Sequence, residues 1–142
     1  MLKRFFAITL MVLALGVLPA LAADLLVTVE KVIPGKGSVL LELDNAPAGW
    51  DDKAKPVATA SVPAAEAGVA YVFKDLPPGR YALAVVDDEN GNGKLDTNFI
   101  GIPKEGFGFS NNLHLQRKPT FEEAAFQLED RGGSIVIQLD RY

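Results

Sequence analysis

Short runs in which apolar and polar residues alternate recur along most of this chain. Successive side chains of a β-strand point to opposite faces, so a period of two residues indicates strands with one buried face. Clusters of Gly, Pro and Asn separate these runs, and helical spacing of apolar residues is nearly absent. The pattern predicts an all-β fold, an antiparallel β-sandwich of seven strands. The seven expected strands cover residues 25–33, 38–43, 57–62, 68–74, 81–86, 124–129 and 134–139.

Turn residues between the expected strands suggest how neighbouring strands pair. The segment 34–37, Pro-Gly-Lys-Gly, is expected to join the first two strands as a hairpin. The segment 75–79, Asp-Leu-Pro-Pro-Gly, is expected to do the same for the fourth and fifth strands. Pro56 and Pro63 flank the third strand. Because proline cannot donate to a β-ladder, this strand is expected at the edge of a sheet.

The first 22 residues have the pattern of an export signal. Lys3 and Arg4 provide a positive start, and the stretch from Phe5 to Leu18 is uncharged and mostly apolar. Ala20-Leu21-Ala22 then gives a small-x-small cleavage pattern. A membrane anchor is the alternative, but the apolar stretch is shorter than the roughly 20 residues that span a bilayer core. We expect cleavage after this pattern, and a single soluble domain, residues 23–142, in the periplasm or secreted.

Charge and cysteine content narrow the class of protein further. Without the signal, 18 acidic residues face the 12 basic ones that remain, a net charge of −6, so nucleic acid is not expected as a partner. The chain has no cysteine. An exported product would therefore have no disulfide and would depend on apolar burial, to which a bound metal would add.

The segment 88–96, Asp-Glu-Asn-Gly-Asn-Gly-Lys-Leu-Asp, sets oxygen-bearing side chains at alternate positions around a glycine. In calcium loops of the pattern D-x-[DN]-x-[DN]-G, positions one, three and five supply side-chain ligands, position seven a backbone carbonyl, and position nine a ligand often through water. The match ends at position twelve, where Phe99 stands in place of a bidentate Glu. Glu105 is the candidate for the missing carboxylate. The predicted ligands of a structural Ca²⁺ are Asp88, Asn90, Asn92, Lys94 through its carbonyl, Asp96 and Glu105.

A turn without metal is the alternative interpretation of the same segment. Two Asn-Gly pairs are typical of tight reversals between strands, with aspartates accepting hydrogen bonds from nearby amides. If metal binds, Asn at positions three and five lowers the ligand charge, and we expect a weak affinity of roughly 10⁻⁴ to 10⁻³ M. Such a site would be structural rather than signalling.

The interval 88–119 has little strand signal and is longer than the usual connection within a domain. We expect one long, ordered loop whose base is held by the ion, because ordering so many residues costs entropy that contacts must offset. The apolar residues expected to anchor this loop are Phe99, Ile100, Ile102, Phe107, Phe109 and Leu113.

Aromatic and amide residues outside the calcium pattern are candidates for contact with a ligand. An exposed indole at Trp50 could stack on a sugar, although aromatic residues in such loops more often pack against the domain. Phe107 and Phe109 could likewise form an exposed, partner-binding tip of the loop or be buried inside it, and burial is favoured. The candidate contact residues are Trp50, Phe107, Phe109, Asn111 and Asn112.

No catalytic constellation is visible in the sequence. Ser110 lacks the second glycine of the nucleophile elbow, and His114 is the single histidine, without partners for zinc or copper. Adjacent carboxylates such as Asp87 and Asp88 point to opposite faces of a strand. We therefore expect a non-enzymatic binding or structural module, with an unknown protein or envelope ligand as its partner. A carbohydrate or cell-envelope ligand-binding domain is the alternative, and a hydrolase fits less well.

The run from Asp87 to Asn112, with two flanking segments, resembles the domain-of-unknown-function family 2141 of exported bacterial proteins. The resemblance covers essentially the whole mature chain. It implies a periplasmic protein with a prealbumin-like or immunoglobulin-like sandwich, and it implies no activity. The segments that carry it are Asp75–Tyr81, Asp88–Asp96, Asn98–Asn112 and Phe121–Ala124.

Overall fold

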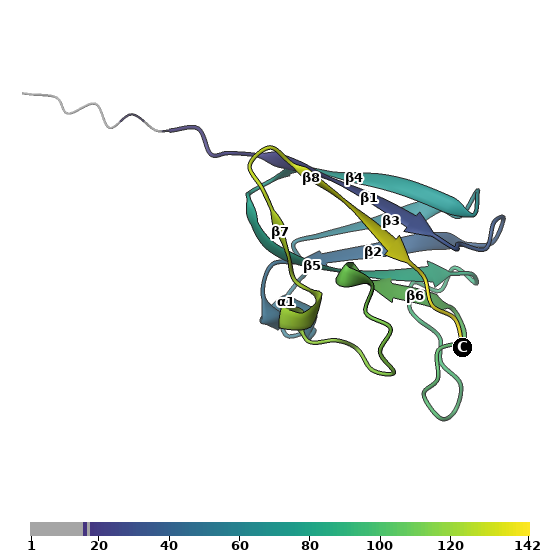
Figure 1. The fold of residues 1–142 in the computed structure, drawn as a ribbon. Coiled ribbons are helices and arrows are strands. Elements are labelled where there is room, and N and C mark those ends of the chain that lie inside the picture. The colour runs from purple at the N-terminus through teal and green to yellow at the C-terminus, as the bar shows by residue number, and fades with distance from the viewer. Residues whose placement is uncertain (1–15, 17) are drawn as a thin grey trace, which may run out of the picture.

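Two β-sheets lie face to face in the computed structural model, which describes residue 16 and residues 18–142 (Figure 1). The strands are β1 (Ala23–Glu30), β2 (Ser38–Asp44), β3 (Ala58–Pro63), β4 (Gly68–Leu76), β5 (Gly79–Asp88), β6 (Gly106–Phe109), β7 (Phe126–Leu128) and β8 (Gly133–Gln138). Three short helical segments complete the fold: α1 (Pro47–Trp50), α2 (Phe121–Ala124) and the 3-10 turn η1 (Ser110–Asn112). The three-stranded sheet has the order β4-β1-β8. The five-stranded sheet has the order β3-β2-β5-β6, and β7 also pairs with β5.

The expected all-β class is confirmed, but the described residues form eight strands rather than seven. The additional strand, β6, lies inside the interval 88–119, which was expected to be a loop. Its sequence, Gly-Phe-Gly-Phe, gives a weak strand signal because glycine is depleted in strands. Gly108 is needed there, since a Cβ at this position would lie 2.7 Å from Ile137 Cγ2 of β8. The fold is also not purely antiparallel as expected, because β8 runs parallel to β1.

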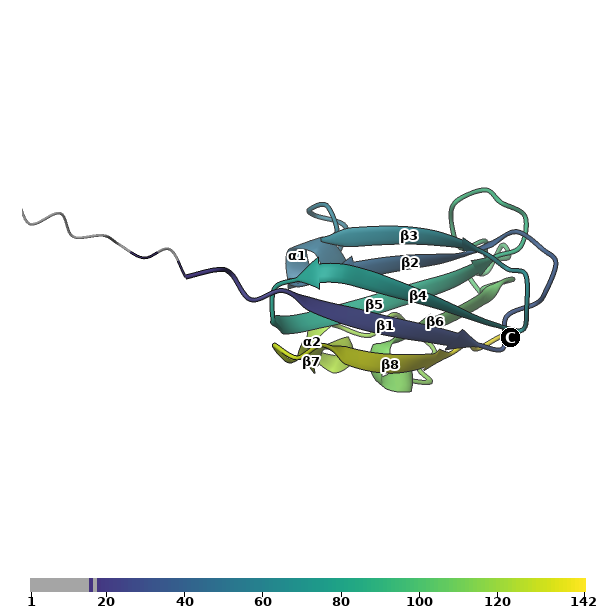
Figure 2. The same ribbon diagram turned by 90° about the horizontal axis from the view of Figure 1, so that it is seen from above.

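Both predicted hairpins are wrong. β1 pairs with β4 and β8, whereas β2 pairs with β3 and β5, so the turn 34–37 carries the chain from one sheet to the other. The turn 75–79 does the same between β4 and β5, and Figure 2 shows the three-stranded sheet lying over the other. Alternation shows which side of a strand is buried, but strands with matching apolar faces can pack across a core as well as pair edge to edge. The expected edge position of the third strand is confirmed, because β3 ends its sheet.

The main core lies between the two sheets. It is formed by the side chains that point inward, which occupy every second position along the strands. Val27 of β1, Leu43 of β2 and Leu83 of β5 are fully buried in it. Burying one such side chain stabilises the fold by about 1.5–3 kcal/mol. At one end of this core the buried Asp87 carboxylate accepts hydrogen bonds from Ile33 N and from the Arg141 guanidinium.

A second, smaller core lies on the outer face of the five-stranded sheet and holds α1 and α2 against β5. Its members are Trp50, Ala82, Phe121 and Ala124. The helix α2 begins with a capping box, in which Thr120 Oγ1 accepts from Glu123 N at 3.3 Å. The strand expected over 124–129 is therefore shortened to β7, because its first residue belongs to this helix.

The predicted export signal falls mostly on residues 1–15 and 17, which lie outside the described residues. Residues 18–22 have no regular secondary structure, and β1 begins at Ala23. Within the described part of the chain, no helix has the length and apolar character needed to cross a membrane.

Candidate functional site

The outer face of the five-stranded sheet carries a floor of side chains that point away from the main core. Strand pairing arranges them in two rows across β2, β5 and β6. An apolar row consists of Leu40, Val86 and Phe107, and a mixed row, one step closer to α1, consists of Glu42, Ala84 and Phe109. Because side chains alternate along a strand, both rows lie on the face opposite to the core residues of the same strands.

Two chain segments border this floor on either side. Together they form a groove of about 890 Å³, named here the outer groove. One wall is the loop 93–103, and the other is the segment 115–118. Tyr142 adds to the second wall, since its ring centre lies 5.8 Å from that of Phe107 and its hydroxyl donates to Leu115 O at 3.4 Å. In Figure 1 both segments extend from the side of the five-stranded sheet that faces away from β1, β4 and β8. The volume is within the range of about 300–1,000 Å³ typical of small-molecule sites.

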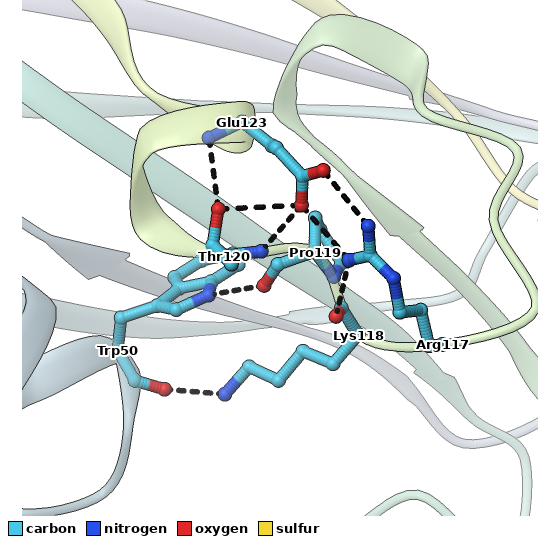
Figure 3. A network of polar contacts seen from close by, with 6 residues as sticks. All are labelled: Trp50, Arg117, Lys118, Pro119, Thr120 and Glu123. Atoms are coloured by element: carbon cyan, nitrogen blue, oxygen red, sulfur yellow. Dashed lines mark hydrogen bonds and ion pairs between the residues drawn. The ribbon is translucent and has the colours of Figure 1, made fainter.

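Trp50 lies behind the end of the outer groove nearest α1, named here the closed end, and Figure 3 shows its polar contacts with Lys118 and Pro119. The indole Nε1 donates to Pro119 O at 2.7 Å. Lys118 Nζ donates to Trp50 O at 2.5 Å and lies 4.8 Å from the ring centre. Arg117 donates two hydrogen bonds of 2.8 Å to the Glu123 carboxylate, and these bonds lower the pKa of Glu123 to about 2. This wall is therefore fixed both to α1 and to α2.

Charged groups of both signs gather at this closed end. Glu42 and Asp52 line the outer groove there, together with Arg117 and Lys118. Asp44, two residues after Glu42 on the same face of β2, is 1% exposed, and among the described residues neither of its carboxylate oxygens has a hydrogen-bond partner. Burial, reinforced by the Glu42 carboxylate, raises the pKa of Asp44 to about 6, although Lys118 acts in the opposite direction.

The predicted calcium ligands come together at the other end of the outer groove, where β5 ends. Asp88 Oδ2 accepts a hydrogen bond from Gly93 N at 2.8 Å, and Asp88 Oδ1 accepts one from Asn92 N at 3.2 Å. The Asp96 carboxylate accepts from the side-chain amides of Asn92 at 2.8 Å and of Asn90 at 2.5 Å. These two amides lower the pKa of Asp96. The polar side chains thus close the loop upon itself.

Glu105 lies buried at the base of the same loop. Its Oε1 accepts from Glu89 N and its Oε2 from Asp96 N, each at 3.0 Å, so this carboxylate links the two limbs of the loop. The predicted ligand set contains only oxygen atoms, and each carboxylate oxygen that accepts one hydrogen bond keeps a second lone pair, which suits Ca²⁺. In the described part of the chain no three carboxylate, His or Cys side chains are grouped closely enough to hold a metal alone. Amide oxygens and the Lys94 carbonyl would therefore have to take part.

The expectation of a packed loop is wrong at the tip of the wall segment 93–103. Phe99 is 99% exposed and Ile100 is 64% exposed, so neither anchors the loop. A bridge between Thr97 and Pro103 closes the neck of the tip, and Asn98 Oδ1 accepts from Ile100 N at 3.0 Å. Local hydrogen bonds hold the loop in place of the expected apolar anchors.

Of the aromatic residues predicted to contact a ligand, one lies in the interior and two line the outer groove. Trp50 is 1% exposed, so the exposed indole that would stack on a sugar is not present. Phe107 is nearly as buried, as the sequence favoured. Phe109 is only partly buried, and its ring centre lies 5.9 Å from those of both Trp50 and Phe107. Phe107 and Phe109 line the outer groove, whereas Trp50 supports it from behind.

The amide residues that follow β6 are engaged with the backbone. Asn111 Nδ2 donates to two carbonyls at the end of α2, at 2.9 and 3.0 Å. Asn112 makes hydrogen bonds of 2.9 and 2.8 Å with the backbone of β8. Between β6 and these residues, Ser110 Oγ accepts from Leu83 N at 3.0 Å and donates to Ala124 O at 2.5 Å. These three side chains connect β5, α2 and β8, and they do not extend into the outer groove.

The family of the chain follows from comparison with known sequences. The profile of the family DUF2141, described as an uncharacterized protein conserved in bacteria, matches residues 27–136. The chain belongs to DUF2141. The resemblance drawn from the sequence is thereby confirmed, and the matched range contains the groove floor, both wall segments and the calcium pattern. No curated protein and no solved structure matches the chain.

Sequence reasoning on this DUF2141 chain missed the outer groove, although a signal for it was present. A strand with one solvated face should carry polar residues at every second position. In β2 and β5, Leu40 and Val86 are apolar at those positions, which indicates that the second face is also used. The charged residues of the closed end gave no comparable signal, because Asp52 and Lys118 are distant in sequence and belong to no recognisable pattern.

Proposed function

We propose that this DUF2141 chain is an exported, non-enzymatic binding module that holds a small ligand in the outer groove. The observation that carries the proposal is the composition of the groove, with the apolar row on its floor and charged side chains at its closed end. Ligand sites usually combine an apolar surface with a few converging polar groups. The hydrogen bonds of Trp50 and Lys118 hold one wall in advance, so ligand binding would not have to order it.

Export is supported by the position of the predicted cleavage site. Because β1 begins at Ala23, removal of residues 1–22 would leave every strand intact. We place the mature protein, residues 23–142, in the periplasm or outside the cell. The prealbumin-like or immunoglobulin-like relationship of the two-sheet fold belongs to the same proposal.

Calcium is the proposed partner of the wall loop. The ligands would be Asp88, Asn90, Asn92, the Lys94 carbonyl, Asp96 and Glu105. The support is that the Asp88 and Glu105 carboxylates already join the loop to its base through backbone amides. A bound ion would add to these bonds and stiffen the wall of the outer groove. Its role would be structural, because the groove floor lies on the sheet and not on the loop.

Thermal unfolding with calcium or with a chelator tests the metal site. With a dissociation constant of roughly 10⁻⁴ to 10⁻³ M, calcium at about 10 mM should stabilise the protein by about 1.4–2.7 kcal/mol. Asp88→Ala should abolish this calcium-dependent rise in Tm, while Asp130→Ala, an exposed turn residue, should leave it unchanged. Identical unfolding of the wild-type protein in calcium and in chelator would refute the site.

Binding of the neutral fluorescent probe N-phenyl-1-naphthylamine tests the outer groove. We expect enhanced probe emission with the wild-type protein and a loss of about tenfold in affinity for Ala84→Phe, which fills the floor. Ala70→Phe, on the exposed face of the other sheet, is the matched control and should bind as the wild type does. A folded Ala84→Phe variant with unchanged affinity would exclude the groove as the binding site.

A carbohydrate or another cell-envelope component is the second candidate ligand. The observation that favours it is the partly exposed ring of Phe109, which lines the outer groove in the same cross-strand row as the polar side chains of Glu42 and Thr59. Aromatic rings next to polar groups can both stack on a ligand and leave it hydrogen-bonded.

A further inference from the structure

We infer that the ligand of the outer groove is a single-chain amphiphile with a zwitterionic head, the chemistry of a lysophospholipid. This inference rests on the proposed function, because it names the ligand class of the same groove. Two observations carry it. The groove changes from mainly apolar to charged along its length, and exposed apolar side chains lie at the tip of the loop that walls its apolar half.

The half of the outer groove next to the loop 93–103 is mainly apolar, although Lys94 and Thr97 of this loop also line it. Leu40 and Val86 lie on its floor, and Leu95 and Pro103 line it from the wall. All four of these side chains are only partly buried, so water contacts apolar surface inside the groove. An alkyl chain lying along this half would remove that surface from water, which is the favourable term in apolar binding.

The half next to α1 offers charges of both signs. Glu42 and Asp52 supply carboxylates, and Arg117 and Lys118 supply cations. Three of these groups lie near the buried Asp44, whose pKa Glu42 and Asp52 raise and Lys118 lowers, while the Arg117 guanidinium is paired with Glu123. A head group with a single charge would meet like charge at this end. A zwitterionic head can place each of its charges beside an opposite one.

Exposed apolar side chains lie at the tip of the loop whose other residues line the apolar half of the groove. Phe99 and Ile100 are exposed at the tip, while Gly101 and Pro103 of the same loop line the groove. Exposed aromatic and aliphatic side chains on a protruding segment suit the interface of a lipid layer, where single-chain amphiphiles reside. The tip and this half of the groove belong to one loop, so an alkyl chain that leaves the groove there would end near the exposed apolar tip.

Orientation of the amphiphile can be measured with Trp50, the only tryptophan of the chain, which lies behind the charged end. The probes are two lysophosphatidylcholines, used below their micelle concentration, with a nitroxide either near the head or at the end of the chain. We expect the label near the head to quench the tryptophan emission at least about twofold more strongly. Equal quenching, or stronger quenching by the chain-end label, would overturn the inferred orientation.

Substitutions and matched ligands test the two halves separately. Val86→Asp should weaken lysophosphatidylcholine binding by about tenfold or more, while Val72→Asp, on the exposed face of the three-stranded sheet, should not. If Val86→Asp fails to fold, Leu40→Asn gives the same test of the apolar half. Glycerophosphocholine, which has the head without the chain, should not bind. Laurate and dodecyltrimethylammonium, each with one charge, should bind about fivefold more weakly, and equal binding of either would overturn the zwitterionic head.

The neutral probe distinguishes failure of this inference from failure of the proposed function. If N-phenyl-1-naphthylamine binds and Ala84→Phe abolishes its binding, but lysophosphatidylcholine does not compete with it, the ligand class is wrong and the groove remains the binding site. If neither compound binds, both proposals are overturned. Competition by lysophosphatidylcholine, lost in Val86→Asp or Leu40→Asn, supports the ligand class.

Discussion

The two faces of the five-stranded sheet are formed by the same strands and meet opposite surroundings. On the inner face of β2 and β5 the residues Val39, Leu41, Leu43, Leu83 and Val85 are all buried in the main core. On the outer face the residues Leu40, Glu42, Asp44, Ala82, Ala84 and Val86 mix apolar, acidic and small side chains. Residues that are adjacent in sequence on β2 and β5 therefore lie in different environments, one in the main core and the next on the outer face. The inner face forms the main core, and the outer face is the one on which we propose ligand binding.

The largest expected difference between the two faces is in stability. Leu83→Ala removes a fully buried side chain from the inner face and should lower the free energy of unfolding by about 2–5 kcal/mol. Val86→Ala, three residues later on the outer face, removes a partly buried side chain and should cost less than about 1 kcal/mol. Urea unfolding monitored by circular dichroism measures both values. Similar losses for the two variants would break the comparison.

A smaller effect is expected at Asp44, which carries a buried carboxylate on the outer face. Its pKa is raised from 3.8 to about 6, so the folded protein binds this proton more tightly than the unfolded chain does. The contribution of Asp44 to stability therefore falls as the pH rises from about 4 to about 6, and its ionised form then costs on the order of 2 kcal/mol.

In the variant Asp44→Asn the side chain cannot ionise, so a comparison with the wild type isolates the cost of ionising the buried carboxylate. The free energy of unfolding of the variant, relative to the wild type, should increase by on the order of 2 kcal/mol between about pH 4 and pH 8. Asp130→Asn, in an exposed turn, should show no such change. Chemical denaturation at the two pH values provides the measurement. A pH-independent difference for Asp44→Asn would mean that its burial carries no electrostatic cost.

The smallest effect is expected at the tip of the groove wall. Phe99→Ser should change the free energy of unfolding by no more than about 0.5 kcal/mol, because the ring is almost wholly exposed. Phe73→Ser, the same substitution in the main core, should cost about 3–5 kcal/mol. Thermal or urea unfolding compares the two. A loss above about 1 kcal/mol for Phe99→Ser would show that the tip anchors the loop after all.

Much of the fold could be predicted from alternation, and its failures have a common physical cause. The pattern identified the inward residues of β1, β2, β4 and β5 correctly, because burial of one face depends on local sequence. It could not show that β1 and β2 face each other across the core, since that depends on contacts between distant segments. The strand β6 was missed because Gly106 and Gly108 weaken the strand signal, although both positions are too closely packed for a Cβ. A Cβ on Gly106 would lie 2.7 Å from the Arg141 guanidinium.

The candidate site was also predictable only in part, because some of it depends on contacts between segments that are distant in sequence. The calcium pattern is local, and its side chains do come together at the end of β5, although metal binding there stays a prediction. The outer groove combines the distant residues Glu42, Asp52 and Lys118, which no spacing rule connects. Trp50 was a candidate ligand contact in the sequence, although packing against the domain was the favoured alternative. It is buried because Pro119 supplies a carbonyl for its indole and α2 covers its ring.

Methyl NMR during a titration with N-phenyl-1-naphthylamine tests the central claim most directly. Leu40 and Leu41, and likewise Val86 and Val85, are adjacent in sequence but lie on opposite faces of the sheet. We predict large shift changes for the methyl groups of Leu40 and Val86 and small ones for those of Leu41 and Val85. Shifts confined to the inner pair, or absent from all four residues while the probe binds, would contradict a binding groove on the outer face.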